Sequence, residues 1–352
     1  MPYIIIFLFT VSVVFSFMED RMKWGFGNGL YLLALSALVL TAGLREIGID
    51  PDSENYELTY RNYYTLAATN NTEFTFLALS AFFNIFTKDV HLLLLTYALL
   101  GVGLKMFAIR KFTQDTFLSL AIYISFYYCI HEVTQIRTGV LSGGFLLALL
   151  AIAQQKRLLG AVFLAIGSCF HVSGIALFPF LFLNNKEFNG KNKLFWICTI
   201  PMGYIIHFIG VGILLMLDLP FIGTKLALYQ SAEEIGLSAS GINVFGPLYM
   251  LNIIIFYYLM YFSEVITKEN KYFPIIMKVY AIGIVAYSTL SFLPVLAERI
   301  SLLIRIVSII ILPCIMYTFS PRWVGIILVF LLGVIYLNYG LNYIDFQLLW
   351  KV

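Results

Sequence analysis

Long apolar segments follow one another along almost the whole chain, and short polar stretches separate most of them. A helix that crosses the roughly 30 Å hydrocarbon layer of a bilayer needs about 20 mostly apolar residues. By that measure the sequence predicts membrane helices near residues 2–18, 29–44, 90–109, 116–131, 134–153, 158–183, 194–217, 245–263, 275–293, 300–318 and 322–340. These ten or eleven elements leave no separate soluble domain. We therefore expect residues 1–352 to form a single all-α, polytopic transmembrane domain.

The segment 158–183 does not fit a simple crossing. It carries three glycines and Pro179 around a central His171, and both of its flanks are basic. Basic loops stay on the cytoplasmic side of a membrane, so the two flanks would have to lie on one side. Two structures remain open. Either a pair of half-helices folds back at Phe170–His171, where freed backbone groups line a cavity, or one tilted span departs from the charge rule.

The loops between the spans predict the orientation. Lys and Arg gather near residues 21–23, 110–111, 156–157, 186–193, 268–271 and 322, and we expect these loops to be cytoplasmic. Two longer segments, 45–87 and 218–243, contain acidic loops instead. Both are expected on the periplasmic side.

Composition supports the membrane class and argues against others. Hydrophobic residues make up 61% of the chain and charged residues only 12%, about half the charged share of a soluble domain. A net charge of +3 with scattered Lys and Arg does not suit a nucleic-acid surface. The four cysteines lie inside apolar runs without a CxxC motif, so neither a disulfide nor a zinc site is expected.

Ionisable side chains near the hydrocarbon layer are energetically unfavourable, so each is a functional candidate. The first group lies after the second predicted span, where Arg45 precedes a loop that holds Asp50, Asp52 and Tyr56. The glycine and proline of this loop predict a turn that holds the acids and the tyrosine at the outer membrane surface. The alternative is an ordinary solvated acidic loop.

The second group is a polar cluster at 131–138, between two apolar runs with almost no loop to spare. Its Arg137 must therefore sit at or within the membrane interface, where a guanidinium group suits the paired oxygens of a phosphate. The alternative is an ion pair between Arg137 and Glu132 that anchors two helices.

Two further candidates lie in later spans. His171 stands alone in an apolar segment, and such a histidine is more often a hydrogen-bonded core residue than a ligand. Glu298, Arg299 and Arg305 open a late span, and Glu298 and Arg305 share a face because they are two helical turns apart. Arg299 could either reach the headgroups or bind an anionic substrate, whereas Arg305 lies deeper.

Together these groups supply arginines, carboxylates, a histidine and tyrosines on one face of the membrane. Such a set fits an anionic headgroup on a lipid. Arginines can stabilise a leaving diphosphate, and a carboxylate or a histidine can take the proton from an attacking sugar hydroxyl. The sequence has no phosphate-binding glycine loop, and we expect neither a metal nor a cofactor.

The succession of these motifs resembles a known family. Gly48, Asp52 and Tyr56 follow an arginine that ends a helix, Ile136-Arg137 opens a later span, Phe170-His171-Val172-Ser173 comes next, and Glu298-Arg299 opens a late one. Over nearly the whole chain this order resembles the EpsG family of bacterial exopolysaccharide polymerases, which is akin to the Wzy-type O-antigen polymerases. The resemblance implies a GT-C-like glycosyltransferase of the inner membrane. It would join undecaprenyl-diphosphate-linked oligosaccharide repeat units at the periplasmic face.

The sequence therefore predicts a polymerase that moves the growing chain from its lipid diphosphate to another lipid-linked unit. Three side chains are expected at the diphosphate: Arg137, Arg299 and Arg305. Other substrate contacts are expected from Arg45, Tyr56 and Glu298, and the base is one of Asp52, Glu132 or His171. The expected partners are the lipid bilayer, the lipid-linked oligosaccharide and a chain-length regulator protein. The alternatives are a flippase or transporter of the same lipid-linked sugar and another membrane transferase, either a ligase or an acyltransferase.

Overall fold

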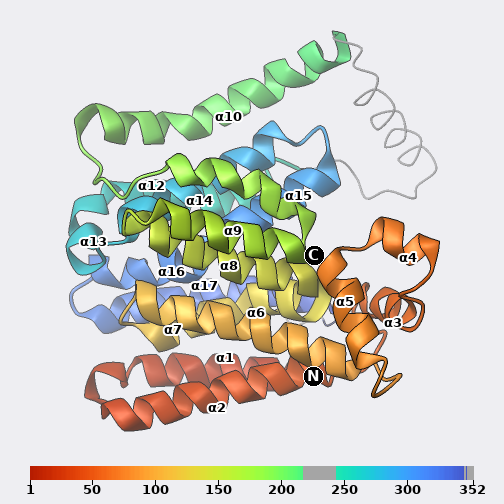
Figure 1. Ribbon diagram of the computed structural model, residues 1–352. Helices are drawn as coiled ribbons and strands as arrows, with labels where there is room; N and C mark the ends of the chain where they lie inside the picture. Colours follow the sequence, from red (N-terminus) through yellow and green to blue (C-terminus); the bar gives the residue numbers. More distant parts are fainter. Residues whose placement is uncertain (217–242, 345, 347–352) are drawn as a thin grey trace.

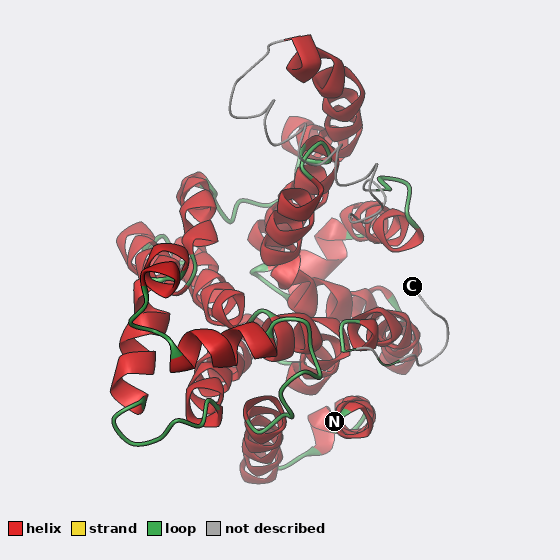
Figure 2. Ribbon diagram, turned by 90° about the vertical axis from the view of Figure 1, so that its right-hand side faces the viewer, coloured by secondary structure: helices red, strands yellow, loops and turns green. Residues whose placement is uncertain are grey.

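The computed structural model describes residues 1–216, 243–344 and 346, and this part of the chain consists of helices joined by loops, without a β-strand (Figure 2). The expected periplasmic segment 218–243 lies outside the described residues except for Asn243. Each apolar segment predicted from the sequence is helical where it is described. The all-α prediction is therefore confirmed.

The long helices run side by side, and their ends gather at two faces (Figure 1). They are α1 (Pro2–Ser16), α2 (Trp24–Gly43), α6 (His91–Phe112), α7 (Thr116–Ile122) with η2 (Tyr123–Thr134), α8 (Ile136–Ala153), α10 (Gly190–Met216), α12 (Pro247–Tyr261), α14 (Phe273–Thr289) and α17 (Arg322–Asn342). A further continuous helical span consists of α15 (Pro294–Ile304), η4 (Arg305–Val307), α16 (Ser308–Ile311) and η5 (Leu312–Thr318).

Length and hydropathy make the chain a multi-pass membrane protein. Among the described residues, six helical spans are long and apolar enough to cross a bilayer, or seven if α12 and α13 (Ser263–Glu269), which are bent by 78°, count as one span. Large apolar side chains also face outward. Phe107, Ile205 and Leu331 are each about half exposed, at 53%, 55% and 52%. A bilayer covers such a surface, whereas exposing this much apolar area to water is energetically unfavourable.

The segment 158–183 folds back on itself. Helix α9 (Arg157–Phe170) and the 3₁₀ helix η3 (Val172–Phe182) meet at His171. A Cβ atom added to Gly160 would lie 3.4 Å from the side chain of Leu181, and one added to Gly174 would lie 2.3 Å from Ser168 Oγ. The two arms therefore pack against each other along their length. Of the two structures left open by the sequence, the chain adopts the fold-back, and both basic flanks lie at one end.

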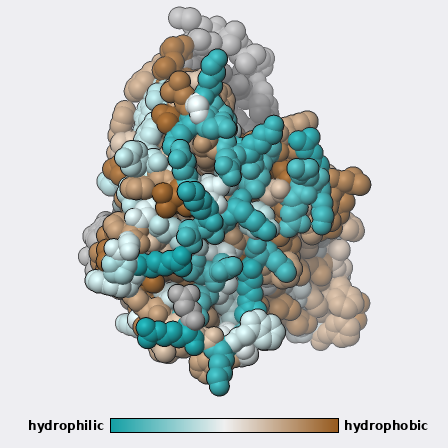
Figure 3. Space-filling view, turned by 90° about the vertical axis from the view of Figure 1, so that its left-hand side faces the viewer, coloured by the Kyte–Doolittle hydropathy of each residue, from teal (hydrophilic) through white to brown (hydrophobic). Residues whose placement is uncertain are grey.

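The two ends of the bundle differ in chemistry. The connections α1–α2, α6–α7, α8–α9 and η3–α10 lie at the end on the left of Figure 1, which we name the basic end. Hydrophilic side chains cover much of this face (Figure 3), and Lys111, Lys156, Arg157 and Lys268 are exposed. The opposite end carries the short helices α3 (Ser53–Arg61), α4 (Leu66–Asn71) and α5 (Phe74–Phe83). We name it the cavity end.

Candidate functional site

Two cavities flank helix α15 at the cavity end of the bundle. The smaller, which we name the polar cavity, has a volume of about 160 Å³. It is lined by Asp52, Asn55, Tyr56, Gln135, Arg137, Thr138, His171, Ser173, Arg299 and Leu303. Four distant parts of the sequence thus meet at one place. The polar cavity brings together five of the residues selected from the sequence: Asp52, Tyr56, Arg137, His171 and Arg299.

A buried ion pair shapes the loop that carries Asp52. Arg45 Nε lies 3.0 Å from Asp50 Oδ2, and both side chains are fully buried. Asp50 Oδ1 also accepts hydrogen bonds from the backbone N–H groups of Asp52 (3.1 Å) and Ser53 (3.0 Å). Arg45 lines neither cavity. It holds the loop in shape through Asp50, and the loop in turn places Asp52 at the cavity.

The carboxylate of Asp52 stands free at the cavity wall. Among the described residues it has no side-chain hydrogen-bond or ion-pair partner, and it is half-buried. Burial raises the pKa of the Asp52 carboxyl above its usual value of 3.8, and the negative charge of Asp50 raises it further. The positive charges of Arg299 and Arg137 act in the opposite direction. The charges of both cavity arginines therefore act on the Asp52 carboxylate, although it forms no hydrogen bond with either.

Arg137 reaches the cavity because the helix breaks just before it. The π-helix η2 ends at Thr134, Gln135 is non-helical, and α8 begins at Ile136. The guanidinium group of Arg137 makes a close ion pair with Glu73. Its Cζ atom also lies 5.8 Å from the centroid of the Tyr56 ring, within the range of a cation–π contact.

Glu73 is a site residue that the sequence analysis missed. It precedes α5 and contacts both Arg137 and the tip of the α9–η3 hairpin. His171 Nε2 lies 3.9 Å from Glu73 Oε1, and His171 Nδ1 accepts a hydrogen bond of 3.2 Å from the backbone N–H of Ser173. The hydroxyl of Thr75 donates to the Cys169 carbonyl at 2.7 Å, which ties α5 to the same tip. The available signal was a carboxylate placed directly before the apolar run 74–83.

Arg299 enters the cavity from α15. Its side chain is exposed, and among the described residues no carboxylate forms an ion pair with it. Arg137 and Arg299 thus approach one small cavity from two helices, and Arg299 keeps its hydrogen-bond donors available. Two such arginines can bind the oxygens of a diphosphate.

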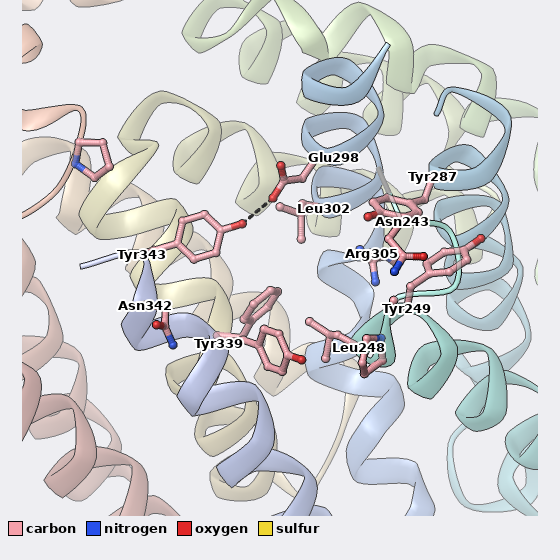
Figure 4. A pocket seen from close by; sticks show the side chains of 14 residues that line it. Asn243, Leu248, Tyr249, Tyr287, Glu298, Leu302, Arg305, Tyr339, Asn342 and Tyr343 are labelled. Carbon is pink, nitrogen blue, oxygen red and sulfur yellow. Dashed lines mark hydrogen bonds between the residues drawn. The ribbon is translucent and has the colours of Figure 1, made fainter. Parts of the chain in front are cut away.

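The larger cavity, which we name the tyrosine cavity, lies on the other side of α15 (Figure 4). Its volume is about 770 Å³. It is lined by Pro51, Phe126, Asn243, Gly246, Pro247, Leu248, Tyr249, Tyr287, Glu298, Leu302, Arg305, Tyr339, Asn342 and Tyr343. Glu298 and Arg305 do share a face, and that face points into this cavity. Arg305 is therefore separated from the arginines of the polar cavity.

Glu132 lies away from both cavities. Its carboxylate makes a close ion pair with Lys105, and both side chains are buried inside the bundle. Lys105 Nζ also donates to the Gly139 carbonyl at 2.5 Å. A Cβ atom added to Gly101 would lie 2.0 Å from Glu132 Oε2, so this glycine makes room for the carboxylate. The alternative pair of Arg137 with Glu132 is wrong, because each has a different partner. Lys105 was missed, although a lysine inside an apolar run is itself a signal.

The described residues contain no group of three or more His, Cys, Asp or Glu side chains that could hold a metal ion. Asp50 and Asp52 have the spacing of a DxD metal motif. However, Asp50 is occupied by Arg45 and by two backbone N–H groups.

Comparison with known proteins supports the motif resemblance. The family model described as the EpsG family matches residues 28–351. The amylovoran biosynthesis protein AmsC of Erwinia amylovora is 24% identical over 291 residues, which cover 78% of this chain and 75% of the AmsC protein. No solved structure matches the chain. Because the family model covers nearly the whole sequence, the chain belongs to the EpsG family.

Proposed function

We propose that this protein is a polysaccharide polymerase that joins oligosaccharide repeat units carried on undecaprenyl diphosphate, at the periplasmic face of the bacterial inner membrane. Membership in the EpsG family and the similarity to a protein of amylovoran biosynthesis support this class of function. The observation that carries the proposal is the polar cavity, where Arg137 and Arg299 lie beside a free carboxylate at the end of a membrane bundle.

In the proposed reaction a hydroxyl group of the acceptor sugar attacks the anomeric carbon of the donor. A new bond forms between that carbon and the acceptor oxygen, and the bond from the carbon to the diphosphate oxygen breaks. The electron pair of the broken bond stays on the lipid diphosphate. Arg137 and Arg299 stabilise the negative charge that develops there. This lowers the barrier because the arginines bind the diphosphate more strongly in the transition state than in the ground state.

Asp52 is the proposed base that takes the proton of the attacking hydroxyl. Its carboxylate has free oxygen atoms, and burial raises its pKa, which strengthens it as a proton acceptor. His171 suits this role less well. One ring nitrogen accepts from the Ser173 N–H group and the other faces Glu73, so a neutral His171 has no lone pair left for a substrate.

Glu73 and His171 are assigned to position Arg137. The contact of Glu73 with Arg137 orients the guanidinium group, and the hairpin tip around His171 holds Glu73 from the other side. This arrangement fixes one arginine and leaves Arg299 free to follow the substrate. We propose that Arg45 acts only through the loop that carries Asp52.

A strain that lacks the gene tests this function directly. Loss of a polymerase leaves single repeat units on the cell surface, and the wild-type gene restores a ladder of longer chains. Loss of a flippase would leave no repeat units outside, and loss of a ligase would leave finished polymer on its lipid carrier. Either of these two phenotypes would refute the polymerase assignment.

A further inference from the structure

The proposed bond-breaking step uses residues of the polar cavity alone, and the tyrosine cavity has a different lining. Four tyrosines line it, three on α12, α14 and α17 and one directly after α17, and a few polar side chains lie between them (Figure 4). Its volume of about 770 Å³ lies within the range of ligand sites, which is roughly 300 to 1,000 Å³. The cavity can therefore hold a ligand much larger than a diphosphate.

The aromatic rings of this cavity are held in fixed positions. The rings of Tyr249 and Tyr287 lie with their centroids 4.6 Å apart. The Tyr249 hydroxyl donates to the Ile284 carbonyl at 2.8 Å, and the Tyr343 hydroxyl donates to Glu298 Oε1 at 2.6 Å. A rigid aromatic wall offers flat apolar faces at a low cost in side-chain entropy.

The polar groups are held as firmly. Arg305 Nε donates to Ser301 Oγ at 2.9 Å. A Cβ atom on Gly283 would lie 2.5 Å from Arg305 Cγ, so the glycine gives the arginine its place against α14. Glu298 accepts one hydrogen bond from Tyr343, and a carboxylate has about four acceptor sites in all. Glu298 and Arg305 thus offer acceptors and donors to one ligand.

This combination fits a carbohydrate. A sugar ring has an apolar C–H face that packs on an aromatic ring, and hydroxyl groups around its edge that both donate and accept hydrogen bonds. A polyprenyl chain has no polar group, so it would leave Glu298 and Arg305 without hydrogen-bond partners in a dry cavity. A diphosphate would meet the like charge of Glu298.

We propose that the tyrosine cavity binds the oligosaccharide of the lipid-linked substrate. The two cavities are lined by consecutive residues at two places, Glu298 and Arg299 on α15 and Pro51 and Asp52 in the loop before α3. The reacting anomeric carbon would lie at this boundary, with its sugar in the tyrosine cavity and the diphosphate in the polar cavity. The proposal rests on the proposed function, and it assigns to the tyrosine cavity the recognition of the sugar.

Binding of sugar without lipid tests this inference. The probe is the repeat-unit oligosaccharide cut from its carrier by mild acid, and its binding to the purified protein is followed by saturation-transfer NMR and by titration. Tyr287→Ala should weaken binding by about tenfold, whereas Tyr287→Phe, which keeps the ring, should bind like the wild type. Tyr261→Ala removes an exposed tyrosine of α12 that lies outside the cavity and serves as the matched control.

The other outcomes are equally decisive. Arg299→Lys should bind the free oligosaccharide normally even if it no longer extends chains. Wild-type binding by a folded Tyr287→Ala protein, or no binding by the wild type up to millimolar concentrations, would overturn the inference. Displacement of the oligosaccharide by undecaprenyl phosphate, which carries no sugar, would make the cavity a lipid site. The polymerase assignment is judged separately, by the surface phenotype of the deletion strain.

Discussion

Glu298 and Arg299 are neighbours in the sequence, yet their side chains line two different cavities. Helix α15 forms the wall between these cavities, because consecutive residues on a helix point about 100° apart. The span that begins at Pro294 therefore serves both the polar cavity and the tyrosine cavity. This division places the proposed diphosphate site and the proposed sugar site on two adjacent faces of one helix.

The first prediction concerns orientation. In a background in which the exposed Cys169 and Cys198 are replaced by serine, Glu54→Cys places a thiol at the cavity end and Lys268→Cys places one at the basic end. The positive-inside rule puts the basic end in the cytoplasm. A membrane-impermeant maleimide should therefore label Glu54→Cys in cells whose outer membrane alone is permeabilised. It should label Lys268→Cys only after the inner membrane is broken, and the reverse pattern would invert the topology.

Most of the fold could be predicted from the sequence, because every membrane helix has to be apolar over its length. The apolar runs predict the helices, and the basic loops predict which helix ends lie at the same end of the bundle. Their exact lengths were harder to predict. Helix α2 starts at Trp24 instead of near residue 29, and the late span starts at Pro294 instead of near residue 300. Hydropathy alone does not mark these ends, because aromatic, Gly and Pro residues extend a helix into the interface.

The second prediction is a pH dependence. The pKa of Asp52 is raised, so the group stays protonated, and inactive as a base, up to a higher pH than an ordinary aspartate. Activity should therefore fall as the pH drops through this raised pKa. Arg299 lowers the pKa of Asp52, so Arg299→Gln should move the acidic limb of kcat/KM to higher pH, while Arg299→Lys leaves it in place.

The same profile tests Asp52 itself. Asp52→Asn should lower kcat by about a hundredfold or more, the usual contribution of a general base, and should abolish the acidic limb. Chain extension by purified protein at a series of pH values provides both measurements. An unchanged acidic limb in Asp52→Asn would assign the titration, and the base, to another group.

The third prediction concerns the buried pair of Lys105 and Glu132. Lys105→Met or Glu132→Leu alone leaves an unpaired charge in the bundle and should reduce stability by about 3 to 5 kcal/mol. The double variant removes both charges and should recover most of this loss. Thermal unfolding in detergent measures the effect. If Glu132 has no part in the chemistry, the folded double variant should extend chains at near the wild-type rate, whereas a folded but inactive double variant would restore Glu132 as a base.

The fourth prediction is that chain extension needs no divalent metal. Two arginines supply the positive charge at the diphosphate in the proposed mechanism, and Asp50, the partner that a DxD site would require, is bonded to Arg45. Purified protein with its lipid-linked substrate should keep extending chains in excess EDTA. Inhibition by EDTA that magnesium or manganese reverses would mean that a metal shares this task.

The site was harder to predict than the fold, because its parts are far apart in the sequence. Ionisable residues in or beside the apolar runs could be selected one by one, and five of them meet in the polar cavity. Their partners could not be assigned. Glu73 pairs with Arg137 across 64 positions, and Lys105 pairs with Glu132 across 27. Only the packing of α6 against η2, and the position of the start of α5 beside α8, bring these groups together.

The central claim is that Arg137 and Arg299 bind the diphosphate, and replacing each by lysine tests it most directly. Lysine keeps the positive charge but loses the planar group that holds two phosphate oxygens at once. Each variant should lose about 3 kcal/mol of transition-state stabilisation, roughly a hundredfold in rate, by analogy with the loss of one oxyanion donor. Arg61→Lys, an exposed arginine paired with Glu57 at the same end, is the matched control and should be unaffected.

The measurement is the length of the polysaccharide ladder, normalised to the amount of protein in the membrane. The account predicts short or absent ladders from Arg137→Lys and Arg299→Lys beside a normal ladder from Arg61→Lys. A lysine can replace an arginine that merely reaches toward the headgroups. Normal ladders from both variants at equal protein levels would therefore contradict the account and leave these arginines as membrane anchors.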